Sequence, residues 1–190
     1  MSSRGGSRVA GSDGRDYQHR ERVADHYVIS ATNKWRLRCV LYLHFSLLVM
    51  MLLRLSTSIF VGVGVRPPRL LQRMQFPRAQ VWEYYWLLSV LPAVVGFLAL
   101  RRSKPIMIQQ YFLGTLIFGV LPALYGIFDQ CDDMILYWRT KEATVKFRGF
   151  PMVVLWNMFL AVILQVHGFG LGFAWALWTA WTTRGSKKSR

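Results

Sequence analysis

FPMVVLWNMFLAVILQVHGFGLGFAWALWTAW, residues 150–181, is an almost uninterrupted apolar run near the carboxyl end of the chain. It contains no Asp, Glu, Lys or Arg, and it exceeds the roughly 20 residues that a helix needs to cross a bilayer core of about 30 Å. A short basic sequence, TTRGSKKSR, follows it directly. The run therefore predicts a transmembrane helix that ends in a short polar tail.

The rest of the chain shows the same clustering of apolar residues. The sequence is 53% hydrophobic, and its apolar residues gather in four blocks instead of recurring at a helical or strand period. Such blocks are typical of a polytopic membrane protein. We therefore predict an all-α integral membrane protein with four transmembrane helices, in a membrane domain of residues 39–181. The expected spans are about 40–61, 82–100, 106–128 and 152–171.

The formal net charge of +15 raises the question of a nucleic-acid partner. However, the Lys and Arg residues lie between and beside the apolar blocks, and no basic patch with interleaved stacking aromatics is present. Anionic lipid headgroups and control of topology explain these charges better. We expect the lipid bilayer as a partner and no nucleic acid.

The basic residues also predict an orientation. An even number of spans places both termini on one side, together with the basic turn from Arg101 to Lys104. By the positive-inside rule that side is cytosolic. The loop from Arg66 to Arg78 is the exception, because it is basic and yet lies on the luminal side.

Single residues in the blocks predict local structure. Arg54 is the one charged residue of its block and is expected to reach the membrane interface through its long stem. Pro92 and Pro122 each remove a backbone hydrogen bond and are expected to kink their helices. The polar stretch from Asp129 to Gly149 is expected to be a solvated loop that has room for a short helix.

The last span carries polar and small residues that are candidates for helix packing. Polar groups in lipid usually face other helices, and a small-xxx-small spacing permits close helix contact. That contact is either within this protein or with a second copy, so a homo-oligomer is an alternative. An intramembrane path for ions is disfavoured because no acidic residue lies in the middle of a span. The candidates are Asn157, Gln165, His167, Gly168 and Gly172.

We predict no catalytic residue, no cofactor and no metal site, and therefore no enzyme activity. The chain has two cysteines, Cys39 and Cys131, expected on opposite sides of the membrane and hence unpaired. Neither belongs to a CxxC or Cys/His cluster with metal spacing. The acidic loop around Asp132 and Asp133 has no calcium pattern. The competing class is a membrane-embedded enzyme or transporter that acts on a lipid or a small solute.

The amino-terminal region predicts two segments. Residues 1–15 have almost nothing to bury and are expected to be disordered. Residues 16–38 have a narrow apolar stripe, which fits a cytosolic amphipathic helix at the membrane surface or against a partner; a solvated charged helix is the alternative. No core requires so polar a string, so we expect an unknown cytosolic partner to bind it. The candidate residues are Asp16, Gln18, His19, Arg20, Glu21, Arg22, His26 and Tyr27.

The sequence of the tail, residues 182–190, predicts a sorting signal. Lys187 and Lys188 stand fourth and third from the carboxyl end, which is the form of a dilysine retrieval signal read by a cytosolic COPI-type coat. The alternative is that these lysines only hold the helix end at the cytosolic surface.

Four stretches of the chain form a recognisable pattern: DGRDYQHRERVA (13–24) with His26-Tyr27, WEY (82–84) with LLSVLP (87–92), PALYG (122–126) and QVH (165–167). In this order they resemble the Jagunal family of endoplasmic reticulum membrane proteins. The polar string is the specific part of this resemblance, because composition alone does not produce it. The resemblance implies a four-span, multi-pass protein of the endoplasmic reticulum membrane with cytosolic termini. It also implies a role in vesicle-mediated transport and reticulum organisation in the secretory pathway.

Overall fold

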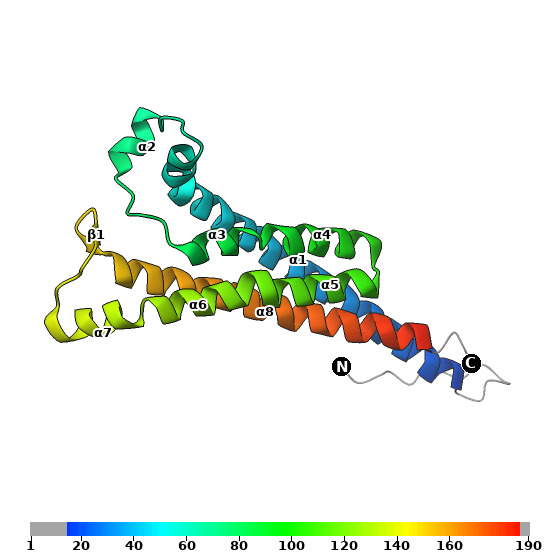
Figure 1. Ribbon diagram of the computed structural model, residues 1–190. Coiled ribbons are helices and arrows are strands. Elements are labelled where there is room, and N and C mark those ends of the chain that lie inside the picture. Colours follow the sequence, from blue (N-terminus) through cyan, green and yellow to red (C-terminus); the bar gives the residue numbers. More distant parts are fainter. Residues whose placement is uncertain (1–14, 187–190) are drawn as a thin grey trace.

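The computed structural model describes the backbone of residues 15–186 and the side chains of residues 26–182 (Figure 1). Its long elements are helices, and four helical stretches are long and apolar enough to cross a membrane. This confirms the prediction of an all-helical chain with four candidate spans. The stretches are His26–Gly62, Val81–Arg102, Pro105–Asp129 and Met152–Thr182.

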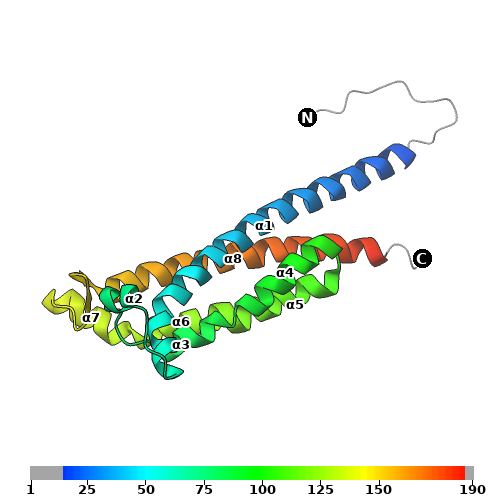
Figure 2. The same ribbon diagram turned by 90° about the horizontal axis from the view of Figure 1, so that it is seen from above.

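Helix α1 (Arg15–Gly62) is continuous over 48 residues. At 1.5 Å per residue it is about 70 Å long, which is more than twice the thickness of a bilayer core. There is no break between residues 16–38, which were predicted to form a separate amphipathic segment, and the first span. Helix α8 (Met152–Ser186) packs beside it over most of the bundle, and the amino-terminal part of α1 extends beyond the other helices (Figure 2).

The second span consists of two helices, α3 (Val81–Leu87) and α4 (Val90–Arg102), separated at Leu88 and Ser89. Pro92 explains the break, because a proline ring inside a helix clashes with the carbonyl group four residues earlier, here that of Leu88. The interruption leaves Ser89 buried at the junction. The predicted effect of this proline on its helix is therefore seen in the structure.

The third span is also irregular. Helix α5 (Pro105–Thr115) passes through a π-helical turn, η1 (Leu116–Val120), into α6 (Leu121–Asp129). The carbonyl four residues before Pro122 belongs to Phe118, within η1. A π turn relieves the clash by widening the helix there, so this proline alters the helix without breaking it.

The connections at the end of the bundle away from the termini are partly ordered. Helix α7 (Cys131–Thr140) confirms the short helix expected in the polar loop, whereas helix α2 (Arg69–Met74) was not predicted. Strands β1 (Lys146–Phe147) and β2 (Phe150–Pro151) form a short antiparallel pair, which also was not predicted. We call this end of the bundle the loop end.

The interior contains two apolar clusters. The cluster nearer the loop end is built around three tryptophans, and the other lies nearer the chain ends, where Tyr111 packs against small residues. Many large apolar side chains on the outside of the helices are exposed in the isolated chain, which suits contact with lipid. The tryptophans of the first cluster are Trp82, Trp86 and Trp156.

Candidate functional site

A layer of buried polar side chains crosses the interior of the bundle. His44 of α1 lies with its Nε2 atom 3.1 Å from the Ser89 hydroxyl oxygen, and Trp86 Nε1 donates a hydrogen bond of 3.2 Å to Nε2 of His167. The two imidazole rings have centroids 4.9 Å apart. We call these four residues the histidine layer. Because each member has a partner in another helix, the layer ties α1, the second span and α8 together.

The π turn makes room for this layer. A Cβ atom at Gly119 would lie 2.7 Å from Cε1 and from Nε2 of His167, closer than a real contact allows. The imidazole therefore occupies space that only glycine leaves open. Pro122, which causes the π turn, and Gly119, which lies within it, thus together shape the wall against His167.

A buried ion pair lies closer to the loop end. Arg54 Nη2 is 3.4 Å from Glu83 Oε1 and donates a hydrogen bond of 3.2 Å to the carbonyl oxygen of Arg78. Glu83 Oε1 also accepts a hydrogen bond of 3.0 Å from the backbone N–H of Gln80 at the start of α3. The expectation that Arg54 reaches out to the lipid interface is therefore wrong. Its side chain turns inward, where Glu83 supplies the opposite charge.

This ion pair is incompletely satisfied. Arg54 Nε, Arg54 Nη1 and Glu83 Oε2 are buried and have no hydrogen-bond partner among the described residues. The guanidinium carbon lies 5.4 Å from the ring centre of Trp156 and 5.8 Å from that of Phe76, which are cation–π distances. The aromatic rings stabilise the charge, but they do not accept its remaining N–H groups in the plane of the guanidinium.

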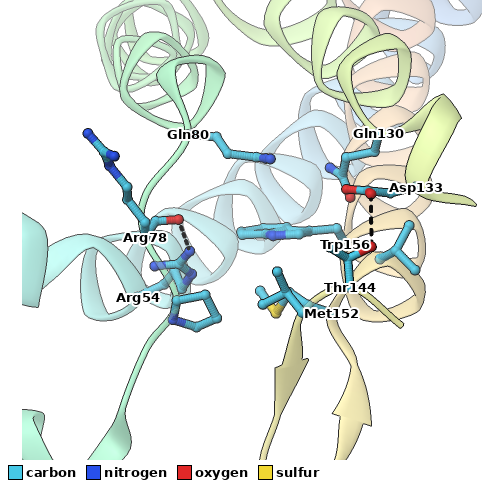
Figure 3. Close-up of a pocket in the computed structure, with 11 residues that line it drawn as sticks. Arg54, Arg78, Gln80, Gln130, Asp133, Thr144, Met152 and Trp156 are labelled. Atoms are coloured by element: carbon cyan, nitrogen blue, oxygen red, sulfur yellow. Dashed lines mark hydrogen bonds between the residues drawn. The ribbon is translucent and has the colours of Figure 1, made fainter. Parts of the chain in front are cut away.

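Arg54 lines a pocket of about 310 Å³ at the loop end (Figure 3). The pocket lies between α1, the loop before α3, the junction of α6 with α7, and the start of α8. Its wall opposite Arg54 contains Asp133, whose Oδ1 accepts a hydrogen bond of 3.2 Å from Thr144 Oγ1. The pocket therefore has a cation on one side and a carboxylate on the other.

The structure separates the packing candidates on α8. His167 is buried in the histidine layer, and Asn157 donates a hydrogen bond of 2.8 Å to its own helix, to the carbonyl oxygen of Val153. Gln165, Gly168 and Gly172 lie instead on the exposed face. A Cβ atom at either glycine would meet no atom within 4 Å, so these glycines do not pack within the chain. Contact with a second copy stays a prediction.

Close helix contact occurs at a glycine that was not singled out. A Cβ atom at Gly170 would lie 2.6 Å from the Tyr111 hydroxyl oxygen, and Val40 would be its next neighbour at 3.4 Å. The glycine that brings α8 close to α1 and α5 therefore lies between the two predicted ones, on the opposite face of the helix.

The terminal candidates are only partly described. Residues 16–22 lie within α1, but their side chains are outside the described set. His26 and Tyr27 are exposed on the same helix. Lys187 and Lys188 lie outside the described residues, just after the end of α8.

Sequence reasoning missed the Arg54–Glu83 pair and the histidine layer. A signal for the pair was present, because Arg54 is the one charged residue of the first apolar block and Glu83 is the one charged residue of the second. Opposite charges in neighbouring spans usually pair. Among the described residues, no group of three or more His, Cys, Asp or Glu side chains is placed to hold a metal ion.

These features define a class: a multi-pass helical membrane protein with four candidate spans and a few polar side chains buried in an apolar interior. The whole sequence identifies the family. Residues 1–185 match the family described as "Jagunal, ER re-organisation during oogenesis". The chain therefore belongs to the Jagunal family.

Relatives match this chain over nearly their full length. The chain is 36% identical to the protein jagunal homolog of Caenorhabditis elegans over 184 residues, which are 95% of this chain and 97% of the relative. It is 35% identical to the protein jagunal of Drosophila melanogaster, with 97% and 96% covered. It is 31% identical to the protein jagunal homolog 1 of Homo sapiens, with 99% and 98% covered. The similarity thus includes all four spans and both terminal regions.

Proposed function

We propose that this protein is a non-enzymatic resident of the endoplasmic reticulum membrane that supports vesicle-mediated transport and reticulum organisation in the early secretory pathway. The family description, which names re-organisation of the endoplasmic reticulum, supports the compartment and the general role. The structure adds a four-span body with distinct ends. The function is therefore to be sought at those ends, where cytosolic or luminal partners have access.

The observation that carries the proposal is that the start of α1 and the end of α8 lie at the same, basic end of the bundle (Figure 1). Trp181 Nε1 donates a hydrogen bond of 3.0 Å to the Ser30 hydroxyl oxygen, which joins the end of α8 to α1. Lys34 Nζ donates one of 2.7 Å to the Ser103 hydroxyl oxygen in the turn between α4 and α5. We call this the terminal end and propose that it faces the cytosol.

Charge supports this orientation. The terminal end carries Lys34, Arg36 and Arg38 on α1, and the turn beside them adds further basic residues. The loop end carries eight Lys and Arg residues, four of them in the basic loop from Arg66 to Arg78, against thirteen in residues 15–38, 101–104 and 184–190. A one-sided excess of basic residues marks the cytosolic side.

A cytosolic terminal end would present two functional segments. The tail after Ser186 would expose Lys187 and Lys188 to a COPI-type coat, which returns the protein to the reticulum. The amino-terminal part of α1 would stand out from the bilayer, since α1 continues without a break and is far longer than a span. We propose that this projecting segment binds the cytosolic partner.

Native and introduced cysteines test the orientation. Cys131 is exposed at the loop end, and Ser189→Cys places a thiol in the tail. Cys39→Ser removes the other native thiol. In sealed reticulum vesicles with their cytosolic face outward, a membrane-impermeant maleimide should label the tail cysteine at once, and should label Cys131 only after detergent is added. The reverse pattern would overturn the proposed orientation.

The retrieval signal is tested by Lys187→Ser with Lys188→Ser. The double variant should leave the reticulum, and a glycosylation site introduced in a loop of the loop end should acquire Golgi-type glycan processing. Arg184→Ser is the matched control, because it removes a basic residue of the same tail at a position the signal does not require. Retention of the double variant in the reticulum would contradict the proposal.

Deletion of residues 13–27 tests whether the amino-terminal segment is needed for reticulum organisation independently of localisation. The shortened protein should still insert and localise correctly but should not restore reticulum organisation in cells that lack the protein. Full restoration would show that the amino-terminal segment is not the partner-binding part.

A further inference from the structure

The turn between α4 and α5 lies at the terminal end, where α1 passes beside it (Figure 1). Lys34 of α1 reaches this turn, since its Nζ atom donates the hydrogen bond of 2.7 Å to the Ser103 hydroxyl oxygen. Leu37 packs in one apolar cluster with Leu100 and Ile108, which lie on either side of the turn. Two segments that are 69 residues apart in sequence therefore bring their basic side chains together. We call these side chains the basic turn cluster: Lys34 and Arg38, one helical turn apart on α1, with Arg101, Arg102 and Lys104.

No carboxylate offsets the charge of the basic turn cluster among the described side chains. None of its members forms an ion pair within residues 26–182. Glu83 is the one acidic residue between Asp25 and Asp129 in the sequence, and it pairs with Arg54 nearer the loop end. Lys34 is partly buried, and the other four side chains of the cluster are exposed. The cluster is therefore an accessible surface whose positive charges have no negative partner in this part of the chain.

The basic turn cluster lies at the depth of lipid headgroups. The second candidate span ends at Arg102 and the third begins at Pro105, so the turn joins two spans at one surface of the bilayer. Trp181, whose ring centre is 5.4 Å from Lys34 Nζ, belongs to the residue type that gathers where helices meet the headgroups. The head of a lipid therefore reaches these cations while its acyl chains stay in the leaflet.

We propose that the basic turn cluster binds an inositol phospholipid whose head carries a phosphomonoester. A phosphomonoester has about −1.5 to −2 charges and three acceptor oxygens, and the phosphodiester of the same lipid adds a further negative charge. Clusters of about four to eight basic residues next to a span are typical of sites for such heads. The guanidinium groups of Arg101 and Arg102 suit the phosphomonoester, because each offers parallel N–H groups. Phosphatidylserine, with a single net negative charge, matches the cluster less well.

The test adds a phosphatidylinositol monophosphate, phosphatidylinositol or phosphatidylserine to the purified full-length protein in detergent micelles and measures bound lipid by native mass spectrometry. The monophosphate should bind about tenfold more tightly than phosphatidylinositol, which lacks only the phosphomonoester. Equal binding of the monophosphate and phosphatidylserine would show an unspecific attraction to anionic lipid and would overturn the proposal. Soluble inositol bisphosphate is the arm without acyl chains. If it displaced the lipid at equal concentration, the surface would be a site for a soluble anion and the proposal would be wrong.

Arg101→Gln with Arg102→Gln removes two exposed cations of the cluster, so folding should be unaffected. Affinity for the monophosphate should fall about thirtyfold, or about fivefold for each cation. Arg66→Gln with Arg69→Gln is the matched control, because it removes the same charge from exposed side chains at the loop end and should leave the affinity unchanged. The unfolding midpoint without lipid checks that both variants are folded. An equal fall in affinity in the two variants would show that binding follows net charge alone, contrary to the proposal.

Lys34→Gln tests whether α1 contributes to the same site. Affinity for the monophosphate should fall about fivefold in this variant. Arg36→Gln is the control on the same helix, since the Arg36 guanidinium carbon lies 5.8 Å from the ring centre of Phe173 on α8, and its affinity should be unchanged. Unchanged affinity in Lys34→Gln, or an equal fall in Arg36→Gln, would contradict the proposed site. Because the readouts are lipid binding and stability in micelles, the result does not depend on the retrieval signal or on the orientation in the reticulum.

Discussion

The histidine layer and the Arg54–Glu83 pair both bury polar side chains inside an apolar helix bundle, but they satisfy the hydrogen-bonding groups of those side chains to different extents. In the histidine layer each polar side chain contacts another, as Trp86 does with His167 and Ser89 with His44. At the ion pair, several donors and an acceptor are left over beside a pocket. The difference teaches that the first cluster joins three spans through satisfied polar contacts, whereas the second holds a charge pair in the interior with part of its hydrogen-bonding capacity unused.

The largest expected effect is at the ion pair. Glu83→Gln leaves Arg54 as a buried cation without an opposite charge, so we expect the free energy of unfolding to fall by roughly 3 kcal/mol. Denaturant titration in micelles, followed by tryptophan fluorescence, would measure this. Glu142→Gln is the control, since Glu142 is exposed and its loss should change little. An unchanged stability in Glu83→Gln would mean that Arg54 does not depend on this carboxylate.

The next effect concerns the space beside the histidine layer. Gly119→Ala introduces a Cβ atom 2.7 Å from His167, and we expect a loss of about 2 kcal/mol from overpacking. Gly168→Ala adds the same methyl group on the open face of α8 and should be neutral. The same titration compares the two variants. Equal free energies of unfolding for the two variants would show that His167 can shift at little cost. That result would contradict a role of the histidine layer in holding the helices together.

A smaller effect is expected from single hydrogen bonds within the layer. The contact of Trp86 with His167 can be isolated by a double-mutant cycle with Trp86→Phe and His167→Phe, measured by the same unfolding titration. We expect a coupling energy of about 1 kcal/mol, as for other hydrogen bonds between membrane helices. A coupling energy near zero would show that this hydrogen bond does not help to hold α3 against α8.

The smallest effect on stability is expected on the face that contacts neither cluster. Gly168→Leu with Gly172→Leu should change the free energy of unfolding of a monomer by less than about 0.5 kcal/mol, because both positions are open. Light scattering coupled to size-exclusion chromatography would show whether the wild-type protein forms a dimer that this variant loses. A monomeric wild type would exclude the predicted homo-oligomer under those conditions.

Much of the fold could be predicted from the sequence because hydropathy reports depth in a membrane. The four spans followed from block length, and the irregular turns near Pro92 and Pro122 followed from proline chemistry. Depth does not report rotation about a helix axis, however. Consequently, it did not show that His167 faces inward whereas Gly168 faces outward.

The pairings were harder to predict because their members are far apart in sequence. Ser89 lies 45 residues from His44, and His167 lies 81 from Trp86, so no local pattern joins them. Arg54 was assigned to the lipid interface because a long side chain near a helix end usually reaches it. The presence of one opposite charge in the next apolar block outweighed that tendency.

The spacing of these contacts also implies an order of assembly during synthesis. Glu83 follows Arg54 by 29 residues, which a ribosome adds in about 1 to 6 seconds. Arg54 is therefore without the opposite charge of Glu83 for only a few seconds during synthesis. The contact of Trp86 with His167 needs 81 more residues after the tryptophan, or about 4 to 16 seconds. Until α8 is synthesised, His44 and Trp86 lack their contacts with His167, and the histidine layer is complete only when α8 packs against the other helices.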